Sequence, residues 1–291
     1  MFHTDPLKPW ETGAFSLGDH GPAMTAKPDH NKKTGCHMLN RVFNRVFLIA
    51  LLAGPMFVSA SESARDLQAI RSKAFDVCNS AMLHFNPNVD RRDGGRDPRH
   101  AEEYRQSLKQ LRGLVDPVRD TRLAAPLEIM ETLLAELERL PSSDEPRYSH
   151  WLNLILQAHA DLDNRAAQLY AAVPLSPAQE SLDALSLNLA RLDLLYQTRT
   201  FGALRFFLSD NSSDPFKALD IKIIDGFDKT EELWPNHSKV ISTSRRNYYF
   251  VRRSLLEHGE DLVQESAAYY LGKITRTLNS LSLAQNEITE P

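Results

Sequence analysis

Apolar residues recur every three or four positions along most of this chain. The clearest stripe is Leu182, Leu185, Leu189, Leu192 and Tyr196, which steps by 3, 4, 3 and 4 residues. This period places the five side chains on one side of an α-helix, whereas a half-buried strand alternates every second residue. Several such stripes in succession indicate a protein that buries one face of each helix against its neighbours.

Prolines and short polar segments divide this pattern into about eight helices. Pro117, Pro126 and Pro141 each end or restart a stripe, because proline lacks the N–H that continues a helix. We expect helices over about residues 67–85, 98–116, 127–140, 147–172, 177–209, 215–234, 238–257 and 261–283. At 1.5 Å per residue, the helix over 177–209 would be about 50 Å long. The sequence therefore predicts an all-α protein, an elongated bundle of antiparallel helices with short connections.

One segment, residues 215–234, fits two patterns. Its apolar residues follow a helical period, but Leu219, Ile221 and Ile223 also alternate as in a strand. No partner strand is evident elsewhere in the sequence, and a lone strand is not stable. We therefore predict a helix.

The strongest helix-start signal is at residues 176–179. Ser176 can accept a hydrogen bond from a free backbone N–H, Pro177 suits the first turn, and Gln179 follows three residues after the serine. A helix is expected to begin here. Residues 61–174 and 175–291 are then candidates for two four-helix halves; the alternative is that the long helix over 177–209 belongs to both halves.

Residues 38–60 have the order of a secretory signal peptide. Arg41 and Arg45 precede an apolar run of 8 residues over 46–53, and small residues end the segment at Ala60. A membrane-spanning helix needs roughly 20 apolar residues, so this run is too short. We predict cleavage after Ala60 and a periplasmic or secreted product, with an uncleaved membrane anchor as the alternative.

A further 37 residues precede Met38, although a signal peptide should start near the beginning of translation. They are rich in Gly, Pro and His and show no helical or strand period. We interpret residues 1–37 as a wrongly assigned start, with Met38 as the initiator; the alternative is a disordered cytosolic tail.

The charge and cysteine content of residues 61–291 exclude several classes of protein. With 28 basic and 34 acidic residues, the net charge is about −6, whereas nucleic-acid binding needs basic patches. Membrane contact is expected only through the signal segment. Cys78 is the single cysteine after Cys36, so this part has no internal disulfide and must be held by its core. Cys78 continues an apolar stripe, which predicts a buried thiol.

The sequence contains few residues arranged for chemistry. Phosphate-binding glycine loops, nucleophile elbows and zinc-protease motifs are missing from it. His159 and Asp163 lie one helical turn apart and could bind a metal if another helix supplied ligands. The alternative is that both belong to a solvated helix face. No cofactor is predicted, and an enzyme is not favoured.

The most unusual composition is the run RRNYYFVRR at residues 245–253. Arg245, Arg252 and Arg253 share one helix face, with Tyr249 between them. Guanidinium groups beside aromatic rings can bind an anion or carboxylate, so these four residues are the predicted ligand-binding site. The alternative is that the arginines pair with nearby acids such as Glu231, Glu232, Glu257 and Asp261.

These observations predict an exported, non-enzymatic helical protein with a sensor-like or accessory role. Its expected ligand is a protein partner or a small anionic molecule. A metal-dependent enzyme centred on His159 and Asp163, or a structural protein of the cell envelope, are the alternatives.

Overall fold

The computed structural model describes residues 63–86, 97–141, 144, 147–199, 204, 213–257 and 263–288. The N-terminal residues 1–37 and the signal segment 38–60 lie outside these ranges, and the predictions about them are untested. Within the described ranges the chain forms α-helices and short 3₁₀ turns but no strand. The prediction of an all-α protein is therefore confirmed.

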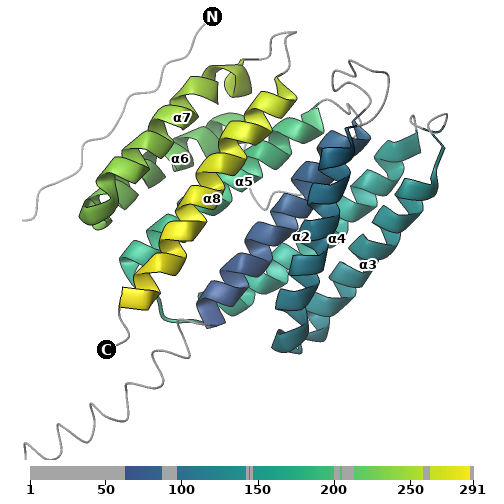
Figure 1. Cartoon of the computed structure of the whole chain (residues 1–291), viewed down its shortest axis with the longest axis horizontal. Helices are drawn as coiled ribbons and strands as arrows, with labels where there is room; N and C mark the ends of the chain where they lie inside the picture. Colours follow the sequence, from purple (N-terminus) through teal and green to yellow (C-terminus); the bar gives the residue numbers. More distant parts are fainter. Residues whose placement is uncertain are drawn as a thin grey trace, which may run out of the picture. The chain divides into compact units, whose positions relative to one another are not determined.

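Eight α-helices follow one another in the described residues (Figure 1). They are a helix over residues 63–85, α2 (Pro98–Val115), α3 (Thr121–Arg139), α4 (Tyr148–Ala171), α5 (Pro177–Arg199), α6 (Pro215–Leu233), α7 (Ser238–Leu256) and α8 (Gln264–Ile288). Two 3₁₀ turns, η1 (Asp116–Val118) and η3 (Pro235–His237), connect α2 to α3 and α6 to α7. The ambiguous segment is thus the helix α6.

Two predicted helix boundaries are wrong. Pro126 lies inside α3, which begins at Thr121 rather than after the proline. The start is set by Asp120, whose side chain accepts a hydrogen bond from the N–H of Arg122, and buried Leu123 anchors the first turn. The helix over 177–209 is also shorter than expected, because α5 ends at Arg199 and Leu204 is not helical.

The predicted start of α5 is confirmed. The hydroxyl of Ser176 accepts a hydrogen bond from the N–H of Gln179 at 3.1 Å, and Pro177 is the first helical residue. The side chain of Gln179 does not complete a capping box; it donates instead to Asp183 at 2.8 Å and to Ser282 at 2.6 Å. The glutamine therefore joins α5 to α8.

The first hydrophobic cluster is formed by the 63–85 helix, α2, α3 and α4, with part of α5. The stripes read from the sequence supply most of it, and Cys78 is fully buried there as predicted. Burial raises the pKa of this thiol well above its ordinary value, because a thiolate would lose its hydration. Helices α3 and α4 lie side by side in this group (Figure 1).

The second hydrophobic cluster is formed by α5, α6, α7 and α8. The predicted stripe of α5 from Leu182 to Tyr196 is buried in it, while Leu187, Ala190 and Leu194 of the same helix belong to the first cluster. Helix α5 is therefore covered on two faces. Figure 1 shows α8 beside α5, in agreement with their packing.

A third, polar face of α5 contacts the 63–85 helix and α8. Ser186 donates to the side chain of Asn279 at 2.6 Å, and Asn279 donates to Ser72 at 2.8 Å. Asp183 accepts from Tyr170 of α4 at 2.7 Å. Hydrogen-bonded side chains thus connect helices of the two hydrophobic clusters.

Candidate functional site

Two of the predicted site arginines hold α7 to α6. The guanidinium group of Arg252 donates two hydrogen bonds, both 2.6 Å long, to the carboxylate of buried Asp220. Burial would raise the pKa of Asp220, but hydrogen bonds from Arg252 and Tyr248 outweigh it and lower this pKa. Arg245 pairs with Asp228 and lies 3.4 Å from Glu231. Both arginine charges are therefore compensated within the protein.

The other two predicted site residues point toward solvent. Arg253 donates to Glu257 at 2.8 Å, yet its side chain remains 81% exposed. Tyr249 is 48% exposed, and its ring lies 5.9 Å from the guanidinium carbon of Arg252. Two acids named as alternatives, Glu231 and Glu257, are among the arginine partners. The structure does not gather the three guanidinium groups around one vacant anion position.

The exposed side of α7 carries a stripe that the sequence analysis missed. Its members step by 4, 3, 4, 3 and 4 residues and are all exposed: Lys239, Thr243, Arg246, Phe250, Arg253 and Glu257. The same helical period that identified the buried faces could have found it. Phe250 stands out among them, because 70% of this large apolar residue is exposed.

Aromatic residues of α8 extend this stripe. The ring of Phe250 lies 4.9 Å from that of Tyr270, which in turn contacts Tyr269 at 5.2 Å. Tyr269 is 58% exposed. We define the aromatic–basic face as Lys239, Arg246, Tyr249, Phe250 and Arg253 of α7 with Tyr269 and Tyr270 of α8.

The predicted metal pair, His159 and Asp163, lies on α4 but is buried rather than solvated, so the alternative of an exposed helix face is wrong. Asp163 is held by Arg71 of the 63–85 helix at 2.6 Å and by Arg191 of α5 at 3.3 Å. Burial would raise the pKa of Asp163, but the arginines outweigh it and lower the pKa. Two guanidinium groups thus stand where a metal ion would have to bind this carboxylate.

The surroundings of His159 differ from those of a metal-binding histidine that is paired with an acid. The His159 ring contacts Phe75 edge to face, with centroids 4.5 Å apart. Burial lowers its pKa to about 4, because the charged imidazolium would lose its hydration, so the ring is neutral near pH 7. In the described part of the chain, no further potential ligand lies close enough to His159 and Asp163 to complete a metal site. Three potential metal ligands do lie together elsewhere, at Asp97, His100 and Glu265.

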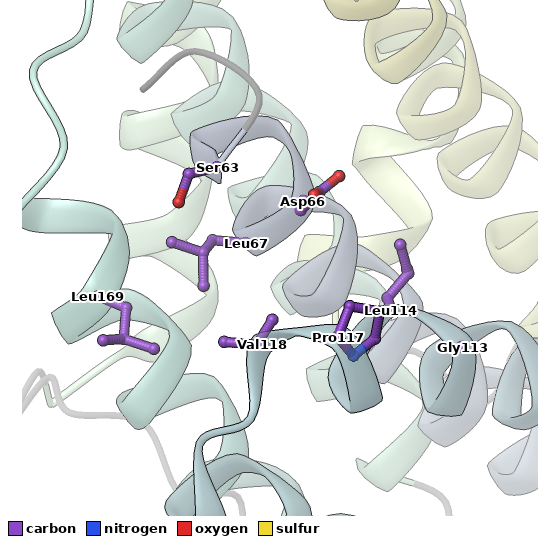
Figure 2. A pocket seen from close by; sticks show the side chains of 8 residues that line it. All are labelled: Ser63, Asp66, Leu67, Gly113, Leu114, Pro117, Val118 and Leu169. Atoms are coloured by element: carbon purple, nitrogen blue, oxygen red, sulfur yellow. The ribbon is translucent and has the colours of Figure 1, made fainter. Parts of the chain in front are cut away.

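A cavity of about 630 Å³ opens at the start of the 63–85 helix (Figure 2). Its lining combines the first turns of that helix with the end of α2, the turn η1 and α4: Ser63, Asp66, Leu67, Gly113, Leu114, Pro117, Val118 and Leu169. Asp66 is the single charged side chain in this lining, so the cavity offers no set of polar groups that converges on a ligand.

Among the helices described, none is both long enough and apolar enough to span a bilayer. Comparison with family models, with curated proteins and with solved structures gave no match to this chain.

Proposed function

We propose that this chain is an exported, non-enzymatic helical protein that binds an acidic protein partner. In this proposal, residues 38–60 are a cleaved signal peptide, and residues 61–291 form an elongated bundle of antiparallel helices in the periplasm or outside the cell. The basic start, short apolar run and small-residue end of the segment support export. The role is sensor-like or accessory.

Phe250 is the observation that supports binding through the aromatic–basic face. A side chain of this size rarely stays 70% exposed in contact with another aromatic ring unless something covers it. Aromatic residues and arginine are enriched at protein–protein contacts, and lysine and glutamate are depleted there. Tyr249 follows Tyr248 on α7, and Tyr269 contacts Tyr270 on α8; their exposed rings would join Phe250 in the contact.

The charge of α7 favours an acidic partner. This helix contains one lysine and four arginines but no acidic residue between Ser238 and Leu256. Arg245 and Arg252 are compensated by acids of α6, and Arg253 forms an exposed pair with Glu257. The side chains of Lys239, Arg246 and Arg253 face solvent. These three positions span about 21 Å of helix at 1.5 Å per residue. A stripe of that length on an exposed helix suits a protein surface better than a small anion.

Site-specific photocrosslinking in the native organism would test this proposal. A benzophenone side chain replaces Phe250 on α7 or, as a matched control, Ile129 on α3, an apolar residue that is 51% exposed. We expect one discrete protein adduct from position 250 and none from position 129. Charge reversal by Arg246→Glu with Arg253→Glu should abolish the adduct, because the partner is attracted electrostatically.

Two results would contradict this function. One is the same adduct pattern from positions 250 and 129, which would mean nonspecific contact. The other is an adduct from position 250 that survives the double charge reversal, which would show that the basic residues do not recruit the partner.

A further inference from the structure

Three potential metal ligands meet where α2 and α8 begin, at the upper end of both helices in Figure 1. Asp97 caps α2, His100 lies in its first turn, and Glu265 lies in the first turn of α8. One ligand atom from each residue lies within 4.8 Å of the other two. The acids at 97 and 265 are far apart in sequence, so only the tertiary fold brings them together.

The histidine of this group has one ring nitrogen beside a carboxylate and the other without a partner among the described residues. Its Nδ1 lies 3.2 Å from a carboxylate oxygen of Glu103. Its Nε2 is buried and has no hydrogen-bond partner in the described part of the protein. In zinc sites, the imidazole typically donates one N–H to a carboxylate and binds the ion through the other nitrogen. Glu103 therefore matches the outer carboxylate, and a bound ion would satisfy Nε2.

The charges around His100 favour a divalent cation. Asp97, Glu103 and Glu265 supply three negative charges, and Arg99 supplies one positive charge among them. The three carboxylates and the one guanidinium leave the group an excess of two negative charges.

Arg99 occupies the carboxylate of Asp97 but is weakly held. Its guanidinium group contacts both carboxylate oxygens, yet 75% of the side chain is exposed to solvent. An exposed ion pair of this kind contributes little to stability, so the guanidinium can move away. The backbone N–H of Arg99 donates to Oδ1 at 2.8 Å, and Oδ2 is then free for another cation.

We propose that Asp97, His100 and Glu265 form a zinc site that joins the start of α2 to the start of α8. One imidazole nitrogen and two carboxylates suit Zn²⁺, and water completes the coordination when the protein supplies three ligands. The ion takes the place of the Arg99 guanidinium at Asp97. None of the three ligands belongs to the aromatic–basic face, so the site does not rest on the proposed function.

Zinc titration of the chelator-treated full-length protein tests the site. We expect about one zinc ion per chain by competition with a chromophoric chelator, and a rise in Tm of roughly 5 °C at a hundredfold excess over Kd. His100→Gln should abolish saturable binding. Glu103→Gln should weaken it by about 10- to 100-fold, because the outer carboxylate orients the imidazole.

His150→Gln is the matched control, since His150 is an exposed histidine on α4 outside the group. It should bind zinc like the unchanged protein. Glu265→Gln alters an exposed side chain and tests the site without threatening the fold. Zinc binding that is lost in His100→Gln and Glu265→Gln but kept in His150→Gln supports the site. The absence of stoichiometric zinc, or unchanged affinity in His100→Gln and Glu265→Gln, overturns it.

Discussion

The pKa of Asp193 depends strongly on its buried surroundings. The residue is fully enclosed on α5 and accepts a hydrogen bond from Gln197 at 3.0 Å. Burial raises its pKa to about 7, and the negative charge of Asp76 adds to the increase. Since the unfolded chain has an ordinary aspartate, the folded state binds this proton more tightly.

Asp193→Asn should therefore change how stability depends on pH. The folded pKa is raised, so stability is fully present below about pH 4 and is lost as the pH rises toward 7. Asparagine has no charge to bury, and the variant should be more stable at pH 8 by up to about 4 kcal/mol, since each pKa unit corresponds to about 1.4 kcal/mol. Urea unfolding at pH 4 and pH 8 measures the difference.

The control for this change is Asp225→Asn on the exposed side of α6, which should be nearly neutral at both pH values. A free energy of unfolding for Asp193→Asn that equals that of the unchanged protein at pH 8 would show that Asp193 titrates normally in the folded state.

At the scale of the helix, two interior glycines differ in the space around them. A Cβ on Gly113 of α2 would have no neighbour within 4 Å, whereas one on Gly226 of α6 would lie 3.2 Å from Cδ1 of Leu185. The glycine at 226 therefore marks the close approach of α6 to α5. The glycine at 113 serves no such purpose in packing.

Gly113→Ala should stabilise the protein by about 0.5–1 kcal/mol, because alanine favours the helix and nothing obstructs its methyl group. Gly226→Ala gains the same helix propensity but forces Leu185 to move, so its net gain should be smaller or absent. Thermal unfolding of the two variants provides the comparison. Equal stabilisation would mean that α6 approaches Leu185 of α5 less closely than 3.2 Å.

For the whole molecule, the question is whether the two hydrophobic clusters unfold together. Helix α5 contributes side chains to both, and hydrogen-bonded residues connect them further. If one cluster unfolded, it would expose one face of α5 and so weaken the other cluster. The division into halves at residues 61–174 and 175–291 stays a prediction that unfolding can decide.

Tryptophan fluorescence separates the clusters, because Trp151 packs against the first and Trp234 lies in the second. In a Trp10→Phe background, the variants Trp151→Phe and Trp234→Phe each keep one reporter. We expect both reporters to give the same urea midpoint after correction for the stability of each variant. Separated midpoints would indicate two independently folding halves.

The sequence by itself determined the helices and their buried stripes. The apolar positions of α5 and α7, the cap at Ser176 and the buried thiol of Cys78 all follow from period and local chemistry, and each is present in the structure. This was possible because helix periodicity depends only on neighbours three and four residues away.

Only the tertiary structure decided what covers each face and which charges meet. The polar residues Asp183, Asp193 and Gln197 suggest an exposed side of α5, yet all three are buried against other helices. Arg252 reaches Asp220 and Arg71 reaches Asp163 across distances in sequence that no local pattern encodes. A period identifies a buried face, but the partner that buries it depends on how all the helices pack.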